Sequence, residues 1–158
     1  SKIDRPPIKR VFLDPGGSAN PKALEAIARA DMVVIGPGDL YTSLIPNLLI
    51  RGISEAINNS KAEKIYVCNL MTKHGETDNY KAEDFLKRIE DFVKVDVALF
   101  NNKRPPKDLL KRYKDKKSEF VEPPTASAKY IIADVLDGDD YVRHDDGNKL
   151  ATALLALL

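Results

Sequence analysis

Residues 32–43, Met-Val-Val-Ile-Gly-Pro-Gly-Asp-Leu-Tyr-Thr-Ser, govern the interpretation of this chain. The run 32–35 is apolar, rich in β-branched residues and free of alternation, which is typical of a strand covered on both faces. It ends at Gly36 and Gly38, which allow positive φ angles and place no Cβ between the backbone and a ligand. The stretch predicts a buried strand followed by a loop of a size suited to phosphate.

The residues beyond the glycines predict a helix. Thr42 and Ser43 are natural cap residues, and apolar residues recur after them at helical spacing. Pro46 is compatible with a helix only in its first turn, where the missing N–H loses no intrahelical bond. A strand, a glycine turn and a helix N-terminus suit an anion, but they also describe a tight turn without a ligand. Asp39 repels phosphate unless it binds a ribose hydroxyl, an amide or a bridging cation.

Composition indicates one soluble α/β domain of 158 residues. The chain is 43% hydrophobic and 31% charged, and 25 basic against 24 acidic residues give a net charge of +1. This balance gives no reason to expect nucleic acid or a membrane surface as a partner. A single cysteine, Cys68, excludes an internal disulfide framework and fits a reducing, cytoplasmic environment. No apolar run approaches the roughly 20 residues of a membrane span.

Short apolar strands are expected to alternate with amphipathic helices along the whole chain. The expected strands are 8–13, 32–35, 64–70, 95–100 and 130–135, with a small edge strand at 119–122. The expected helices are 21–30, 43–57 with a break near Arg51 and Gly52, 82–93, 107–113 and 148–158, and an acidic loop is expected at 137–147. This order predicts a mainly parallel sheet with helices on both faces and right-handed crossovers.

The loops that follow the strands carry the candidate binding residues. In parallel sheets ligands bind beyond the carboxyl ends of the strands, near a switch in strand order. One edge of the sheet is therefore expected to gather Asp14, Gly36, Gly38, Asp39, Asn69, Thr72, Asn101 and Asn102.

Two of these groups have alternative interpretations. Asn101 and Asn102 suit a base edge or a sugar hydroxyl, or they satisfy the backbone of a turn. Residues 103–117 hold eight Lys or Arg against two Asp, which indicates either a solvated helix face or a rim that attracts an anionic ligand. In the second case Tyr113 is available to stack on a base or sugar.

The segment 137–147 adds one cation among acidic residues. Arg143 suits a diphosphate because its guanidinium donates two parallel hydrogen bonds, or it pairs with neighbouring aspartates. Those aspartates are Asp139, Asp140, Asp145 and Asp146, which either hold Mg²⁺ or form an exposed turn. With only two histidines and one cysteine, the sequence does not predict a zinc site. It also contains no complete P-loop and no nucleophile elbow, so it does not support a hydrolase.

Several ordered motifs resemble one known family. They are residues 36–43 with 45–49, Cys68-Asn69, Met71-Thr72 with 75–77, Asn101-Asn102, and residues 142–145. Together they resemble the gluconeogenesis factor (YvcK-like) branch of the CofD-like superfamily. The resemblance covers essentially this whole chain and implies a Rossmann-like, three-layer α/β/α fold.

Family members begin with a strand and a loop of the type Gly-Gly-Gly-Thr-Gly, which has no match here. The resemblance therefore implies that residues 1–158 are the C-terminal part of a larger Rossmann-like domain. The other part would supply further strands and part of the nucleotide site. His74 also departs from the family pattern, which commonly has proline at this position.

The resemblance implies a cytoplasmic, non-catalytic protein that binds a nucleotide sugar such as UDP-N-acetylglucosamine. Such a protein would link gluconeogenic carbon flux to cell-wall precursors and cell shape, with Mg²⁺ possible beside the nucleotide and homo-oligomers possible. The alternative is a CofD-type transferase that moves a phospholactyl group from a guanine-nucleotide donor to a deazaflavin precursor. A further alternative is a half-domain without a competent site. The resemblance assigns ligand contacts to Gly36, Gly38, Asp39, Asn69, Thr72, Tyr113 and Arg143.

Overall fold

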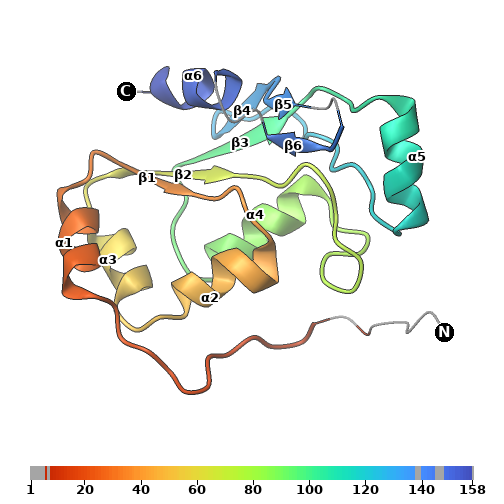
Figure 1. The fold of residues 1–158 in the computed structure, drawn as a ribbon. Coiled ribbons are helices and arrows are strands. Elements are labelled where there is room, and N and C mark those ends of the chain that lie inside the picture. The colour runs from red at the N-terminus through yellow and green to blue at the C-terminus, as the bar shows by residue number, and fades with distance from the viewer. Residues whose placement is uncertain (1–5, 7, 138–139, 145–147, 158) are drawn as a thin grey trace.

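A parallel sheet of four strands forms the centre of the computed structural model, which describes residues 6, 8–137, 140–144 and 148–157 (Figure 1). The strands are β1 (Met32–Ile35), β2 (Glu63–Val67), β3 (Val97–Asn101) and β4 (Tyr130–Ala133). Their spatial order is β1-β2-β3-β4, and every neighbouring pair is parallel. The predicted α/β class is confirmed. The predicted switch in strand order is not present among the described strands, which lie in sequence order.

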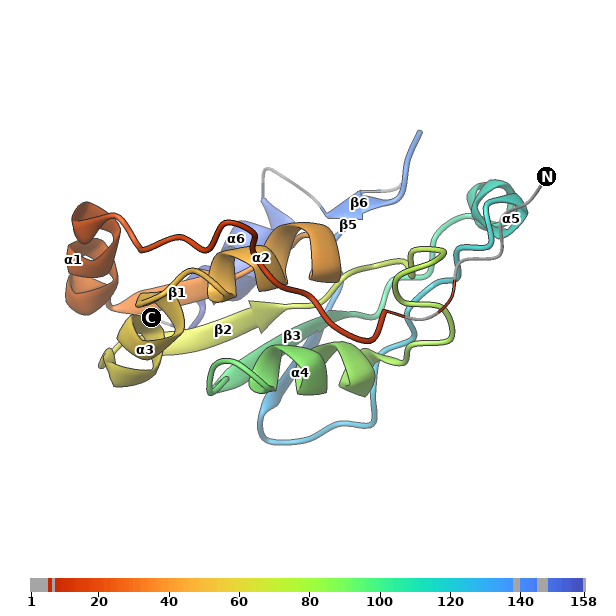
Figure 2. The same ribbon diagram turned by 90° about the horizontal axis from the view of Figure 1, so that it is seen from below.

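Helices cover both faces of the sheet, but unequally (Figure 2). On one face lie α1 (Pro21–Arg29), α2 (Ile45–Leu48), α3 (Ile53–Asn59) and α4 (Ala82–Glu90). The other face is covered by α6 (Lys149–Leu155), whose Leu150 and Leu154 pack against Val67 and Leu99. Helix α5 (Lys107–Asp115) stands beside the sheet rather than over it (Figure 1).

Burial of the central strands explains why their sequences do not alternate. Ile65, Tyr66 and Val67 of β2 are completely buried, although neighbouring residues point to opposite faces of the sheet. One set of side chains packs under α2, α3 and α4, and the other packs under α6. Helices on both faces therefore favour apolar residues on both sides of these strands, away from the polar residues Glu63, Lys64 and Asn101 at their ends.

The strand predicted at 8–13 is wrong. These residues lie outside the sheet in an extended segment, in which Ile8 and Val11 pack against the core and Phe12 is 64% exposed. Their apolar composition favours a strand, but none of the described strands pairs with them. Asp14 follows this unpaired segment and does not reach the edge where the other loops meet.

The helix predicted from about residue 43 begins earlier. A π-helical turn, η1 (Leu40–Leu44), precedes α2, and the N–H groups of Ser43 and Leu44 both donate to the carbonyl oxygen of Asp39. Thr42 and Ser43 therefore lie inside the helical segment and are not its caps. Pro46 lies in the first turn of α2, where a helix tolerates it as predicted.

Two smaller elements also differ from expectation. Residues 119–122 do not form a strand, although Phe120 makes one antiparallel bridge with Met71. The predicted acidic loop contains a short hairpin of β5 (Leu136–Asp137) and β6 (Arg143–His144). Residues 138–139 and 145–147 of that loop lie outside the described residues. The helices that the structure describes include none with the length and apolarity needed to cross a bilayer.

Candidate functional site

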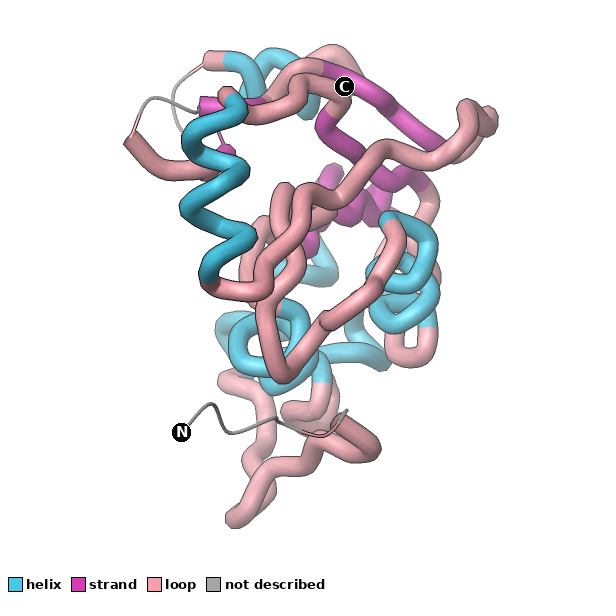
Figure 3. Tube along the Cα trace, turned by 90° about the vertical axis from the view of Figure 1, so that its right-hand side faces the viewer, coloured by secondary structure: helices cyan, strands magenta, loops and turns pink. Residues whose placement is uncertain are grey.

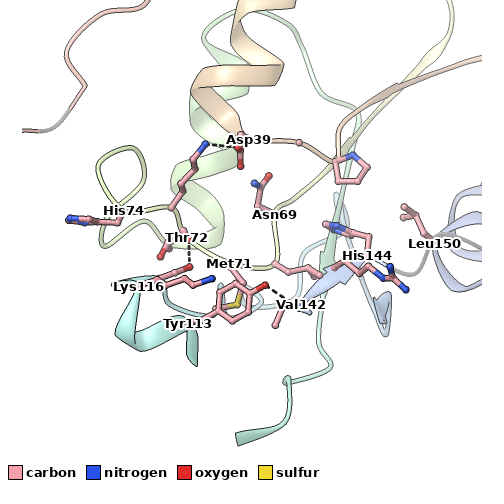
Figure 4. Close-up of a pocket in the computed structure, with 16 residues that line it drawn as sticks. Asp39, Asn69, Met71, Thr72, His74, Tyr113, Lys116, Val142, His144 and Leu150 are labelled. Carbon is pink, nitrogen blue, oxygen red and sulfur yellow. Dashed lines mark hydrogen bonds and ion pairs between the residues drawn. The ribbon is translucent and has the colours of Figure 1, made fainter. Parts of the chain in front are cut away.

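A cavity of about 800 Å³ opens at the carboxyl ends of β1 and β2 (Figure 4). Loops after these two strands form one side of it, and α5 with the β5–β6 hairpin forms the other. Its lining contains six of the nine residues predicted to bind ligand: Gly38, Asp39, Asn69, Thr72, Tyr113 and Arg143. Three of the predicted residues do not line it: Gly36, Asn101 and Asn102.

Gly36 is required by packing against the sheet rather than by contact with the cavity. Its φ angle is +96°, and a Cβ placed on it would lie 2.8 Å from the carbonyl oxygen of Val67 in β2. That distance is too short for any other residue. The sequence interpretation gave this glycine a ligand-facing role, but its bare Cα faces the neighbouring strand. Gly38 does line the cavity, and a Cβ there would lie 3.1 Å from Leu44.

Asp39 is held by a lysine that the sequence interpretation did not select. Lys73 Nζ lies 2.5 Å from Asp39 Oδ2 and 2.8 Å from Glu76 Oε1. The hydrogen bond to Asp39, followed by the one to Glu76, raises the pKa of Lys73, so its ammonium group stays charged. The Asp39 carboxylate therefore has a cation beside it, and this cation is the ammonium group of Lys73. The repulsion between Asp39 and a phosphate is reduced accordingly.

Asn69 and Thr72 follow β2 and line the same cavity in different ways. The Oδ1 atom of Asn69 is buried and has no hydrogen-bond partner among the described residues. The Thr72 hydroxyl is occupied, because its oxygen accepts the N–H of Glu119 at 2.8 Å. The Thr72 N–H also donates to the Glu119 carbonyl at 2.7 Å. Asn69 is therefore the polar side chain here that still lacks a partner, whereas Thr72 fixes the loop to residues 118–119.

Asn101 and Asn102 lie at the end of β3, away from the cavity. The Asn101 side chain is buried, and its Oδ1 accepts the N–H groups of Lys103 and Val135, each at 3.2 Å. Its Nδ2 donates to the carbonyl of Lys103 at 2.7 Å. These bonds bear out the alternative that this asparagine satisfies turn backbone. Asn102 is exposed.

The opposite wall is built from α5 and the β5–β6 hairpin. The N–H of Val142 donates to the Tyr113 hydroxyl at 3.2 Å, which ties the hairpin to α5. His144 Nε2 lies 2.9 Å from the carbonyl oxygen of Cys68, which ties the hairpin to the end of β2. Burial lowers the pKa of His144, although the bond to Cys68 opposes this shift, and the ring is neutral at pH 7. A neutral ring in this position donates from Nε2.

Arg143 forms an ion pair with Asp137 within the hairpin. Its Nε lies 2.8 Å from Asp137 Oδ2, across the β5–β6 pair. Pairing with an aspartate was one of the two sequence-based alternatives, and Asp137 is such a partner. Three of the four aspartates considered, at positions 139, 145 and 146, lie outside the described residues. Arg143 also lines the cavity, and its side chain remains 62% exposed. A ligand phosphate is therefore still accessible to it.

The residues that sequence interpretation missed lie mostly on these two walls. They are Pro37, Leu70, Met71, Lys73, His74, Lys116, Ser118, Val142, His144 and Leu150. Lys73 gave a usable signal, because it directly follows Thr72 in a loop already selected. His144 and Leu150 gave none, since the fold of the hairpin and the placement of α6 decide their positions. His74 lies at the margin, where its side chain points away from the centre of the cavity (Figure 4).

The cavity does not form a magnesium site from protein groups alone. Among the lining residues that the structure describes, Asp39 is the one carboxylate, and Lys73 already contacts it. The described residues hold no cluster of three or more His, Cys, Asp or Glu side chains placed to bind a metal. Mg²⁺ needs one or two carboxylates together with substrate phosphates, so Asp39 alone would have to serve.

Comparison with known proteins supports the same family. The chain is 44% identical over 158 residues to the gluconeogenesis factor of Halalkalibacterium halodurans, covering 94% of this chain and 49% of that protein. It is 43% identical over 149 residues to the putative gluconeogenesis factor of Thermotoga maritima, covering 87% of this chain and 48% of the relative. The gluconeogenesis factor of Bacillus subtilis is 35% identical over 161 residues, and the match covers 96% of this chain and 50% of that protein. The chain thus spans about half the length of these relatives.

A solved structure shows the same arrangement of elements. A crystal structure of a protein from Bacillus halodurans superimposes with a TM-score of 0.87 at 38% identity, covering 96% of this chain and 51% of that one. The sequence model of the family "2-phospho-L-lactate transferase CofD" matches residues 1–139. That match covers most of the chain, and the similar relatives carry the name gluconeogenesis factor. The chain therefore belongs to the CofD family.

Proposed function

We propose that the cavity beyond β1 and β2 binds a nucleotide sugar of the UDP-N-acetylglucosamine type. The supporting observation is that Gly38, Asp39, Asn69, Tyr113 and Arg143, which lie far apart in sequence, line one cavity. Its volume of about 800 Å³ lies in the range of small-molecule sites.

The charges on the cavity walls suit a diphosphate. The cations in the lining are Lys73, Lys116 and Arg143, against Asp39 as the carboxylate, so an anionic ligand is attracted. Asn69 supplies an amide oxygen, Oδ1, without a partner among the described residues, which suits an N–H of a uracil edge or of an N-acetyl group. In this proposal Arg143 contacts phosphate, and Tyr113 contacts the sugar or the base.

We further propose that ligand binding is regulatory rather than catalytic. The described residues of the cavity lining include no nucleophile paired with a general base: the Ser118 hydroxyl donates to the carbonyl of Thr72, and His144 is bound to Cys68. The name of the relatives connects such a regulator with gluconeogenesis. Within this proposal, the cytoplasmic protein reports the level of a cell-wall precursor to carbon metabolism and so affects cell shape.

A transferase is the second candidate, because the matching family model is that of 2-phospho-L-lactate transferase CofD. A guanine-nucleotide donor with Mg²⁺ would then occupy the cavity, and Asp39 would have to exchange Lys73 for the metal. The two candidates differ in ligand and in turnover, so one set of titrations separates them.

Isothermal titration calorimetry with UDP-N-acetylglucosamine, UDP, GDP and GTP tests both candidates. We expect UDP-N-acetylglucosamine to bind most tightly and to remain intact by phosphorus NMR. Asn69→Ala and Arg143→Ala should each weaken binding about tenfold, the effect of losing roughly 1.4 kcal/mol of contact energy. Asn102→Ala is the matched control, because the same side chain is removed from an exposed site outside the cavity.

Tighter binding of a guanine nucleotide, with release of its phosphoryl group in the presence of Mg²⁺, would favour the transferase. The longer Halalkalibacterium halodurans relative is titrated in parallel. If that protein binds the UDP sugar and residues 1–158 do not, the present chain forms only part of a site. Absence of heat from every nucleotide with both proteins would refute both candidates.

A further inference from the structure

Helix α5 exposes an unusual amount of positive charge. It lies along one end of the molecule, and the view onto that end shows no other element in front of it (Figure 3). Of its nine residues, Leu109 alone is buried. The helix therefore presents most of its circumference to solvent or to a partner.

Three lysines form a stripe on the outer face of α5. Lys107, Lys111 and Lys114 are separated by four and three positions, so they lie above one another on the helix. None of the three has an ion-pair partner among the residues that the structure describes. Some surface cations have partners, such as Arg88 with Asp91, whereas Lys22, Lys61 and Lys81 have none among the described residues. What distinguishes the stripe is that its three lysines lie on one face of a single helix.

The stripe costs stability when nothing covers it. Like charges at this spacing destabilise a helix by a few tenths of a kcal/mol per pair. Asp108 and Asp115 lie next to the stripe, but neither is within ion-pair distance of any of its lysines in the described structure. A partner with carboxylates at matching spacing would relieve the repulsion among the lysines.

We propose that this lysine stripe is a docking surface for an acidic helical segment of another protein. Such a segment carries Glu or Asp at positions i, i+4 and i+7, opposite Lys107, Lys111 and Lys114. The surface is distinct from the cavity, because none of its three lysines belongs to the cavity lining. The proposal does not depend on which ligand the cavity binds.

The chemistry of α5 favours a protein over the other anionic partners. Single-stranded nucleic acid needs exposed aromatic side chains for stacking. The single aromatic of α5, Tyr113, is half-buried, with its hydroxyl bound to Val142 and its ring covered by the Lys116 ammonium at 5.9 Å. A membrane surface requires exposed apolar side chains beside the cations. The apolar positions of α5 are instead buried at Leu109 and half-buried at Leu110.

Binding of a designed peptide probe tests the proposal. The probe is an alanine-rich helical peptide with Glu at i, i+4 and i+7, and its control has Gln at the same three positions. Nitrogen-15 NMR of the folded chain at low ionic strength should show shifts at α5 amides with the Glu peptide only. The triple variant Lys107→Gln/Lys111→Gln/Lys114→Gln should weaken binding at least about fivefold, which corresponds to the loss of three exposed ion pairs.

A second triple variant controls for net charge. Lys22→Gln/Lys61→Gln/Lys81→Gln removes the same charge from exposed positions outside α5, and we expect it to bind the Glu peptide like the unmodified chain. Equal weakening by both triple variants would contradict the proposal. The proposal would also be contradicted if a uridine oligonucleotide or phosphatidylserine vesicles bound to the stripe more tightly than the Glu peptide does. The control variant should unfold at the same temperature as the unmodified chain, because its substituted side chains are exposed. The stripe variant should unfold at the same temperature or slightly above it, because the repulsion among its lysines is removed.

Discussion

His144 Nε2 and the carbonyl oxygen of Cys68 are joined by a 2.9 Å hydrogen bond. This bond connects the β5–β6 hairpin to the end of β2, although the two residues are 76 positions apart. It places the hairpin over the cavity, with Arg143 and Val142 on its wall. The bond also explains how residues 142–144, which the sequence places in an acidic loop, come to form part of the site.

The first prediction concerns the stability of the chain at acidic pH and the role of His144 in it. Burial lowers the pKa of folded His144, so the unfolded chain takes up the proton first as the pH falls. The contribution of this residue to stability is therefore complete above about pH 6.5, the ordinary histidine value, and declines below it. The difference in free energy of unfolding between the unmodified chain and His144→Gln, measured with urea, should be larger at about pH 7.5 than at about pH 5.5. A constant difference would show that the ring is not held neutral by the fold.

The second prediction concerns the Cys68 thiol. Burial raises the pKa of this thiol to about 12, and its side chain is 2% exposed. We expect no reaction with Ellman's reagent at neutral pH in the folded chain and one reactive thiol per chain in denaturant. Because the unfolded thiol ionises at lower pH than the folded one, stability should also fall as the pH rises above about 9. Rapid labelling of the folded chain would place Cys68 at the surface instead.

The third prediction concerns the glycine after β1. Gly36→Ala forces a Cβ to 2.8 Å from the Val67 carbonyl oxygen at a φ angle of +96°. The positive φ alone costs about 1–2 kcal/mol, and the contact adds to it. Chemical denaturation should therefore show a loss above about 2 kcal/mol. Gly16→Ala is the matched control, because a Cβ there meets no atom within 4 Å and stability should change little.

The fourth prediction concerns the charges beside the cavity. Lys73→Met leaves the Glu76 carboxylate, whose side chain is only 9% exposed, without its cation. Since Lys73 itself is 44% exposed, we expect a moderate loss of roughly 1–2 kcal/mol in the free energy of unfolding. The double variant Lys73→Met/Glu76→Gln should regain part of that stability, because no buried charge remains. If the double variant is less stable than Lys73→Met, charge compensation is not the main role of Lys73.

The fifth prediction concerns the link between α5 and the hairpin. Tyr113→Phe removes the hydroxyl that accepts the N–H of Val142 at 3.2 Å. The hairpin then loses one of its attachments, and amide hydrogen exchange at Val142 and Arg143 should become faster. The β2 amides, which are deep in the sheet, serve as the internal reference and should exchange as before.

The sequence was sufficient to predict the sheet and most of the helices. Unalternating apolar runs predicted β1, β2, β3 and β4. The completely buried residues of β2 and β3 agree with strands covered on both faces, whereas Val34 of β1 is 40% exposed. Pro21 behind Asn20 correctly marked the start of α1, where Asn20 accepts the N–H of Lys22. These features depend on local sequence and on burial, which a single chain records directly.

The failures share one physical origin, which is pairing between distant segments. Residues 8–13 have strand composition, but composition does not say whether a neighbouring strand exists. Gly36 was assigned to a ligand because nothing in the sequence shows how close Val67 approaches it. Asn101 looked equally suitable for a ligand and for turn backbone, and only the positions of Lys103 and Val135 distinguish the two.

The two walls of the cavity are anchored very differently. The wall at Gly38 is tightly packed against Leu44, and the preceding Gly36, outside the cavity lining, lies against the backbone of Val67. The facing wall is held at Tyr113 and His144 by single hydrogen bonds. If the cavity adjusts to ligands of different length, we therefore expect the change on the hairpin side, where Arg143 lies, while the loop at Gly38 stays in place.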